Sequence, residues 1–311
     1  MRILAVSLRF ALVSALCFPL IALAGEVEWK AHMDGGAAAM RRGDYQTAAA
    51  RFEAARKEAE PYGASDKRLL ITLFILAQSY GALGRHAEAD RLYRQVILSL
   101  EKNLGAEHPE VASALNDLAE LYRAQGRYAE AEPLYQRSLG IREKTLGSGH
   151  PDVAATLNGL ALLYQAQGLY AKAEPLYRRA LAILEKTLGP EHPHVAIVWN
   201  NLAELNRAQG RNAEAEPLYR RSIAISEKAL GPEHPSVANT LNNLALLYRA
   251  QGRNAEAEPL FQRSLRILER ELGPKHPNVA AILNNLADLY KAQGRGAEAD
   301  ALLLLPAEPK K

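Results

Sequence analysis

The sequence predicts an all-α solenoid built from stacked helix-turn-helix repeats. A His-Pro pair and a Gln-Gly pair each recur with a period of 42 residues, and apolar residues between them follow helical spacing. A fixed period of this length is typical of repeat arrays, in which each unit buries its apolar face only against its neighbours. The 311 residues are therefore expected to form one array of stacked units, and the usual estimate of domain number from length does not apply.

The first 24 residues are interpreted as a cleavable secretory signal. Arg2 and Arg9 stand at the front, an apolar run follows, and small residues at 22 and 24 flank a leucine at the exit. This order is typical of an export signal. An uncleaved membrane anchor is the alternative, since a span needs about 20 apolar residues, but Arg9 and Pro19 favour cleavage. We expect an exported protein, periplasmic or secreted from a bacterium, with no stable membrane span.

Composition excludes several classes of function. The only cysteine, Cys17, lies inside the signal, so the mature chain has no thiol for a disulfide, a metal site or catalysis. The formal charge is +3, and loss of the two signal arginines leaves +1, which gives no indication of nucleic-acid binding. Sequence motifs of hydrolases, zinc proteases and nucleotide-binding loops are missing, so an enzyme is not expected and no cofactor is predicted.

The mature chain divides at its turn residues. Residues 26–59 form a short, divergent unit, and Asp66 stands 42 residues before His108 at a position suited to cap a helix. Full repeats are predicted at 66–107, 108–149, 150–191, 192–233 and 234–275, followed by a truncated repeat at 276–305 and a tail at 306–311.

Each full repeat is expected to hold two helices. In the first, Leu115, Leu118, Ala119 and Tyr122 follow the spacing of an amphipathic helix. The proline of each His-Pro pair suits the first helical position, and the glycine of each Gln-Gly pair suits the turn that ends this helix. The second helix runs to about residue 146, with a proline in its second turn that is expected to bend it. Both helices should be about 24 to 30 Å long.

Two columns of alanine are expected to let the helices approach closely, while an aromatic column fills the space between layers. The columns are Ala77, Ala119, Ala161, Ala203, Ala245 and Ala287; Ala89, Ala131, Ala173, Ala215, Ala257 and Ala299; and Tyr93, Tyr135, Tyr177, Tyr219 and Phe261. The last unit ends differently, in the run Leu302, Leu303, Leu304 and Leu305, which either covers the last core or docks a partner or a second copy.

From about Asp66 onward, the segments L-N-N-L-A-x-L-Y, Q-G-R, E-A-E-P-L-Y and L-G-x-x-H-P resemble the tetratricopeptide repeat, in the 42-residue form of kinesin light chains. The resemblance implies a right-handed superhelix whose first helices line a concave groove that binds peptide segments of other proteins. Nothing in the chain resembles the coiled coil of a light chain, so the resemblance implies a binding scaffold and not a motor partner.

The resemblance places on the groove face the first asparagine of each N-N pair and residues four, seven and eight positions further on. The candidate peptide-binding residues are Asn116, Asn158, Asn200, Asn242, Asn284, Arg123, Arg207, Leu246, Arg249 and Lys291. An asparagine ladder could hydrogen-bond an extended peptide backbone; the alternative is that these amides hold neighbouring helices together. The second asparagines, Asn201, Asn243 and Asn285, are expected to be mainly structural.

Charges on this face are expected to form pairs three residues apart, Glu120 with Arg123, Glu204 with Arg207 and Asp288 with Lys291, on a solvated surface. Leu246 replaces the acid in one repeat, so Arg249 has no partner at this spacing. We therefore expect the Leu246 and Arg249 region to receive an acidic-plus-apolar peptide motif. Assembly through the convex face or the C-terminal leucines, as a structural subunit or homo-oligomer, is the alternative function. An enzyme or a glycan binder is a third interpretation, which would need a ligand-sized pocket with converging polar groups.

The histidine of each His-Pro pair raises the question of a metal site. These histidines fall once per layer, and layers about 10 Å apart are too distant for shared ligation. Capping of the helix start or loop packing is the expected role, and no metal site is predicted.

Overall fold

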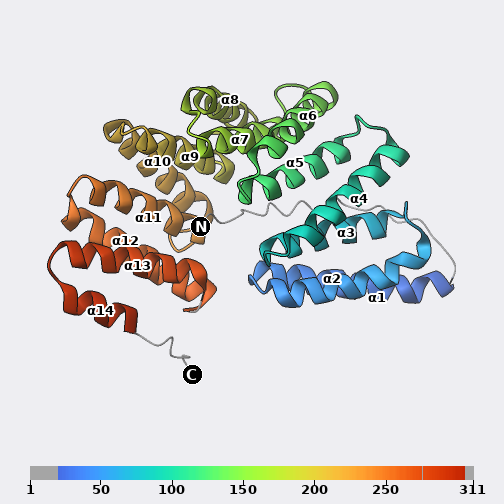
Figure 1. Ribbon diagram of the computed structural model, residues 1–311, viewed down its shortest axis with the longest axis horizontal. Coiled ribbons are helices and arrows are strands. Elements are labelled where there is room, and N and C mark those ends of the chain that lie inside the picture. Colours follow the sequence, from blue (N-terminus) through green and yellow to red (C-terminus); the bar gives the residue numbers. More distant parts are fainter. Residues whose placement is uncertain (1–19, 275, 305–311) are drawn as a thin grey trace. The chain divides into compact units, whose positions relative to one another are not determined.

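The computed structural model describes residues 20–274 and 276–304, and within them the chain is helical with no strand (Figure 1). Its contacts separate two compact units, Met1–Ser148 and Gly149–Lys311. The first unit holds α1 (Leu20–Arg41), α2 (Tyr45–Ala59), the short 3-10 helix η1 (Glu60–Tyr62), α3 (Lys67–Ala82), α4 (His86–Leu104), α5 (Pro109–Ala124) and α6 (Tyr128–Leu146). The second unit holds α7 (Pro151–Ala166), α8 (Tyr170–Leu188), α9 (Pro193–Ala208), α10 (Asn212–Leu230), α11 (Pro235–Ala250), α12 (Asn254–Leu272), α13 (Pro277–Ala292) and α14 (Gly296–Leu304).

Within each unit the helices form stacked pairs. The two helices of a pair make the most extensive contacts, and the second helix also packs on the first helix of the next pair. This arrangement confirms the predicted all-α solenoid of helix-turn-helix repeats. The regular first helices have 16 residues and the second helices 19, which gives lengths of about 24 and 28 Å and confirms the expected range.

The His-Pro pairs start the first helices. In each of the five copies, proline is the first helical residue and the histidine before it is the N-cap. The histidine Nδ1 accepts a hydrogen bond from the backbone N–H two residues later, at 3.1 to 3.3 Å. Asp66 caps α3 in the same way, through Arg68 N–H at 2.9 Å. The predicted capping role is therefore confirmed.

Glycine ends the first helices as predicted. Gly126, Gly210 and Gly252 have φ of 73°, 73° and 74°, a left-handed conformation that other residues adopt at a cost of about 1 kcal/mol or more. The second helices continue through Pro133, Pro175, Pro217 and Pro259 without interruption. The bend expected at these prolines stays a prediction.

The core is formed by the predicted columns. All twelve alanines and all five aromatic residues of the three columns are buried. The divergent first unit follows the same packing rule, because a Cβ added at Gly36 in α1 would lie 2.5 Å from the ring of Phe52 in α2. A small residue therefore faces an aromatic residue there, as in the later repeats.

The two ends of the chain are described in part. Residues 1–19 of the predicted signal lie outside the described residues, and its last five residues lie in α1. No helix within 20–274 and 276–304 is both long and apolar enough to span a membrane. In α14, Leu302 packs against the core of the second unit while Leu303 is 45% exposed. Leu305 and the side chain of Leu304 lie outside the described part of the chain.

Candidate peptide-binding face

The asparagines of the second unit form a ladder between layers. Each second asparagine donates through Nδ2 to Oδ1 of the first asparagine of the preceding repeat. The three bonds are Asn201 to Asn158 at 2.9 Å, Asn243 to Asn200 at 3.0 Å and Asn285 to Asn242 at 2.9 Å. The structural role predicted for the second asparagines is confirmed, and the first asparagines contribute their acceptors to the same ladder.

The two ends of the asparagine column differ from its middle. Asn284 in the last repeat is exposed. Asn116 in the first unit has a buried Oδ1 without a hydrogen-bond partner among the described residues. The residue 43 positions after it, where the ladder elsewhere has its donor, is Gly159, which has no side chain. The first unit uses another pair, Gln78 Nε2 donating to Asp117 Oδ2 at 2.8 Å, and burial raises the pKa of Asp117.

The acid-arginine pairs are part of the packing. Arg123 Nη2 lies 2.5 Å from Glu120 Oε2, with only 9% of the arginine side chain exposed. Glu120 also accepts a hydrogen bond from the hydroxyl of the buried Tyr135. Arg207 and Glu204, 3.0 Å apart, form the same arrangement with the Tyr219 hydroxyl. The expectation of a solvated surface is wrong here, because the carboxylate satisfies a hydroxyl that would otherwise be buried without an acceptor.

Two repeats have leucine in place of this acid, and neither leaves a buried tyrosine hydroxyl without an acceptor. Leu162 replaces the acid in α7, and the Tyr177 hydroxyl donates instead to Gln165 Oε1 at 2.7 Å. Leu246 replaces it in α11, where the aromatic residue is Phe261, which has no hydroxyl. The variable positions of the first helices are thus matched to the second helix of their own repeat.

Arg249 has a partner from the next layer. Its Nη1 lies 3.7 Å from Asp288 Oδ2 and donates to the backbone oxygen of Asn285 at 3.2 Å. The expected pair of Asp288 with Lys291 is therefore wrong, since Asp288 faces Arg249 on the neighbouring helix. Lys291 is exposed and forms no ion pair with a described residue, and Leu246 is half-buried against the core.

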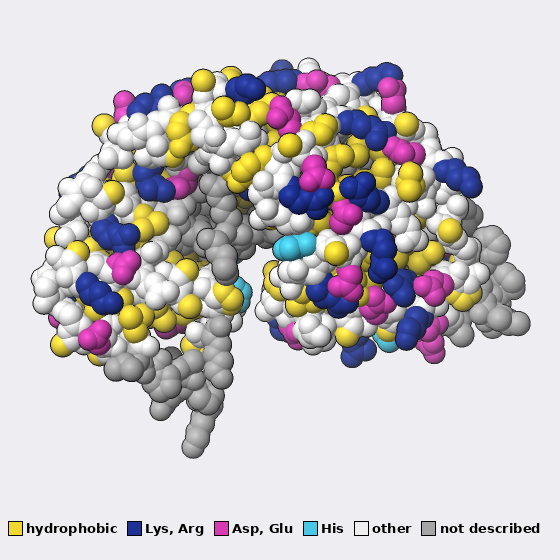
Figure 2. Space-filling model, viewed as in Figure 1, with side chains coloured by type: hydrophobic (Ala, Val, Ile, Leu, Met, Phe, Trp, Pro, Cys, Tyr) yellow, Lys and Arg dark blue, Asp and Glu magenta, His cyan; other side chains and the backbone are white. Residues whose placement is uncertain are grey.

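A second set of ion pairs between layers was not predicted. The arginine before each of three second helices reaches the acid of the preceding second helix, at 2.7 to 2.8 Å. The pairs are Arg211 with Glu174, Arg253 with Glu216 and Arg295 with Glu258. Hydrogen bonds from Arg253, Tyr248 and Arg220 lower the pKa of Glu216 to about 2. Figure 2 shows positive and negative side chains interspersed on the face drawn, as such pairing requires.

The described residues give no support for a metal site. No group of three or more His, Cys, Asp or Glu side chains within 20–274 and 276–304 is placed to hold a metal ion. The rings of His192 and His194 are stacked with centroids 5.1 Å apart, but His192 uses Nδ1 to cap its helix.

Comparison with known proteins assigns the family. The sequence profile of the tetratricopeptide repeat matches residues 77–144, 110–186, 152–228, 194–270 and 236–304, which together span most of the chain. A search of the curated proteins gives no match.

Solved structures agree with this assignment. One is a Podosopora anserina protein named as a kinesin light chain with nearly identical TPR-like repeats. It is 35% identical to this chain, the match covers 65% of this chain and 95% of that chain, and the TM-score is 0.54. BtubC (BKLC) from P. vanneervenii shares 25% identity over 82% of this chain and 94% of that chain, with a TM-score of 0.58. Aspartyl phosphate phosphatase F from Bacillus subtilis, at 16% identity, covers 91% of this chain and 70% of that chain with a TM-score of 0.68, and shows a similar fold only. The chain belongs to the tetratricopeptide repeat family, whose fold generally serves as a protein-interaction scaffold.

Proposed function

We propose that the protein is a non-catalytic scaffold that holds a peptide segment of a partner protein in a concave groove lined by its first helices. One observation carries the proposal. The two alanine columns that let the layers stack are the same in every full repeat, whereas the first-helix position four residues after the asparagine changes from repeat to repeat. Its occupants are Glu120, Leu162, Glu204, Leu246 and Asp288. A constant frame with a varied face is what recognition of one particular partner requires.

The second unit offers the most accessible chemistry for the peptide. Lys291 and Asn284 are exposed on α13, and Leu246 is half-buried on α11. Lys291 provides a cation for an acidic residue and Leu246 an apolar contact, so we keep an acidic-plus-apolar motif as the proposed ligand. Arg249 contributes less, because Asp288 already compensates its charge. The amides of Asn158, Asn200 and Asn242 keep donors for a peptide backbone beside their ladder bonds.

We further propose that the protein works in a bacterial envelope, since residues 1–24 have the order of an export signal. Its partner would then be another envelope or secreted protein. Mass spectrometry of the protein isolated from the cell envelope of its host should find a chain that starts near Gly25. A full-length chain in the cytoplasm would contradict this location.

The binding test is a crosslinked pull-down of the full chain from its own compartment, with the wild type beside Lys291→Glu. We expect the wild type to recover a stoichiometric protein partner and the variant to recover several-fold less. Lys186→Glu, on the second helix α8, makes the same change at an exposed position where the lysine forms no ion pair with a described residue, and is the matched control. Equal recovery by wild type and Lys291→Glu would contradict the proposed groove.

Assembly is the second candidate function, because Leu303 is exposed beside the packed Leu302. If the C-terminal leucines join two copies, Leu303→Glu should convert a dimer into a monomer in size-exclusion chromatography with light scattering. A wild-type chain that is already monomeric at high concentration would remove this alternative.

A further inference from the structure

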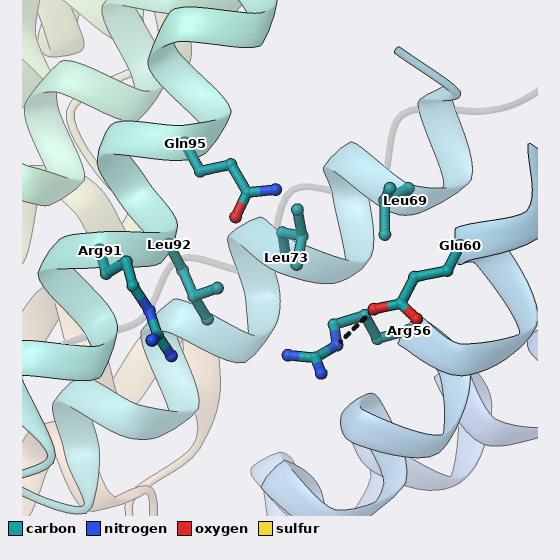
Figure 3. A pocket seen from close by; sticks show the side chains of 7 residues that line it. All are labelled: Arg56, Glu60, Leu69, Leu73, Arg91, Leu92 and Gln95. Atoms are coloured by element: carbon teal, nitrogen blue, oxygen red, sulfur yellow. Dashed lines mark ion pairs between the residues drawn. The ribbon is translucent and has the colours of Figure 1, made fainter. Parts of the chain in front are cut away.

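A pocket lies in the first unit between α2, α3 and α4 (Figure 3). Its volume is about 420 Å³, within the range of small-ligand sites. Leu69, Leu73 and Leu92 are buried and form its apolar floor. Arg56 and Glu60 on one side face Arg91 and Gln95 on the other.

The pocket exists because an ion pair of the later layers is missing at this place. Between α4 and α6, Arg137 lies 2.6 Å from Glu101 and links the two second helices. Arg221 with Glu185 and Arg263 with Glu227 do the same in the second unit, at 3.2 and 2.7 Å. Because α2 starts 41 residues before α4, the arginine position between these helices is Gln95 and the acid position is Glu60, which pairs with Arg56 instead, at 3.1 Å. No ion pair can form from Gln95 and Glu60, and the space between the helices stays open.

The charge around the pocket is uneven. Arg56 is neutralised by two carboxylates, Glu53 at 3.4 Å and Glu60 at 3.1 Å. Arg91 is exposed and has no ion pair or hydrogen bond to another described residue. It also departs from the repeat pattern, since the later second helices have proline at this position. The hydrogen bond from Arg85 and, to a smaller extent, the charge of Arg91 lower the pKa of Glu88, but Glu88 forms its ion pair with Arg85. A guanidinium outside any ion pair therefore stands beside an apolar floor.

The apolar surface continues beyond the pocket. Leu98 is 66% exposed and lies on the same face of α4 as Arg91 and Gln95, since spacings of three and four residues align on a helix. A ligand that extends along α4 would meet a cation, an amide and an aliphatic side chain in turn. A peptide segment has this extended, mixed chemistry.

We infer that this pocket binds an acidic peptide segment, with an aliphatic side chain on Leu69, Leu73 and Leu92 and a neighbouring carboxylate held by Arg91 and Gln95. The site goes beyond the proposed function, because it lies in the first unit and uses none of the first-helix candidates. A planar guanidinium and a carboxylate form a charge-assisted, bidentate pair, which gives the contact its direction.

The test uses the full chain and two end-capped hexapeptides, one with an aspartate between two leucines and one with asparagine in its place. Isothermal titration calorimetry should show the aspartate peptide bound about tenfold more tightly than the asparagine peptide. Arg91→Ala should weaken the aspartate peptide about tenfold and leave the asparagine peptide unchanged. Lys102→Ala removes an equal charge from an exposed position of α4 outside the pocket and should change neither.

Gln95→Trp tests the site without removing charge. Its side chain would fill the space over the leucines, so both peptides should lose binding while the helical content stays the same. The inference is overturned if neither peptide binds at millimolar concentration, if Arg91→Ala and Lys102→Ala act equally, or if octanoate binds as tightly as the aspartate peptide. Lys291→Glu should leave this binding unchanged, so a failure of the groove and a failure of the pocket give different results.

Discussion

Buried tyrosine hydroxyls show how single residues are matched within a repeat. Tyr219 donates to Glu204, which also holds Arg207, whereas Tyr177 donates to Gln165. Each combination gives the tyrosine hydroxyl an acceptor. Where that acceptor is the carboxylate of Glu204, Arg207 compensates its charge. The variable first-helix face therefore serves the core of its own repeat as well as any partner.

This matching predicts a rescue. Glu204→Leu leaves the Tyr219 hydroxyl without an acceptor and Arg207 without its acid, which should cost about 2 to 3 kcal/mol of unfolding free energy. The double variant with Arg207→Gln copies the Leu162 and Gln165 combination, so most of this loss should return. Urea unfolding followed by circular dichroism measures both variants. Equal midpoints for the single and double variants would show that the hydroxyl is not the cause.

Two adjacent glycines in α1 should respond oppositely to the same change. A Cβ at Gly36 would lie 2.5 Å from the Phe52 ring, so Gly36→Ala should cost about 1 to 3 kcal/mol. A Cβ at Gly35 would meet only the Arg51 side chain at 3.6 Å. Gly35→Ala should therefore stabilise the helix by up to about 1 kcal/mol, the usual gain of alanine over glycine. Thermal unfolding of both variants checks the sign, and destabilisation by both would refute the packing argument.

At the scale of the helices, the first helices depend on their histidine caps. Histidine is an uncommon N-cap, and it works here because the neutral ring offers Nδ1 as an acceptor. The protonated ring has only donors, so the caps depend on pH in a way that aspartate or asparagine caps do not.

His276 provides the test of this dependence. Burial lowers its pKa from 6.5, so the folded chain favours the neutral ring. The stability that it contributes is complete above about pH 6.5 and is lost as the pH falls through the folded-state pKa. His276→Asn should keep the cap without the pH dependence. His276→Ala should be about 1 kcal/mol less stable than His276→Asn at all pH values, so its deficit against the wild type should shrink as the pH falls. Hydrogen exchange of the α13 amides, corrected for intrinsic rates, measures the stability of the helix start at each pH. If the asparagine variant showed the same pH response as the wild type, the histidine would not be the source of the pH dependence.

The link between α10 and the next layer should fail at lower pH. Arg253, Tyr248 and Arg220 lower the pKa of Glu216 from 4.5 to about 2. Because the folded pKa is depressed, the stabilisation is complete above about pH 4.5 and is lost as the pH falls toward 2.

Glu216→Gln should therefore be less stable than the wild type at pH 7, and the difference should shrink between pH 4.5 and 2. Chemical unfolding at each pH measures the difference. Glu214→Gln, at an exposed position of the same helix, is the control and should show no such trend. A difference that stays constant down to pH 2 would rule out the link.

The elements were predictable from the sequence because each depends on neighbours in the chain. Proline at the helix start, glycine at its end and the alanine columns follow local geometry, and all appear where expected. The contacts of Arg249 and Glu216 were not predictable by this route. Each depends on a residue 36 to 39 positions away on another layer, and the one-repeat spacing does not tell whether a charge pairs within its helix or with the next. The groove residues stay a prediction, because the described contacts show how they pack and not what they bind.

At the scale of the whole molecule, the 42-residue period determines which residues meet between layers. Within the second unit each layer contacts the next through the same positions, so the stability of such an array is close to a sum over repeats and their interfaces. The sequence supports this additivity, since the residues at the two sides of each junction in the second unit are nearly the same.

Removal of residues 234–275, one full period, should therefore leave a folded chain. Asn285 would meet Asn200 in place of Asn242, and Arg295 would meet Glu216 in place of Glu258, with the same side-chain types in each new pair. We expect unchanged helical content per residue and a denaturant m-value that falls in proportion to the length removed. Removal of residues 234–254 takes out α11 and leaves α12 without its partner, so this half-period variant should aggregate or lose cooperative unfolding. If both deletions fold equally well, the 42-residue register would not determine the stacking; if the full-period deletion fails to fold, contacts specific to the removed repeat would have to hold the array together.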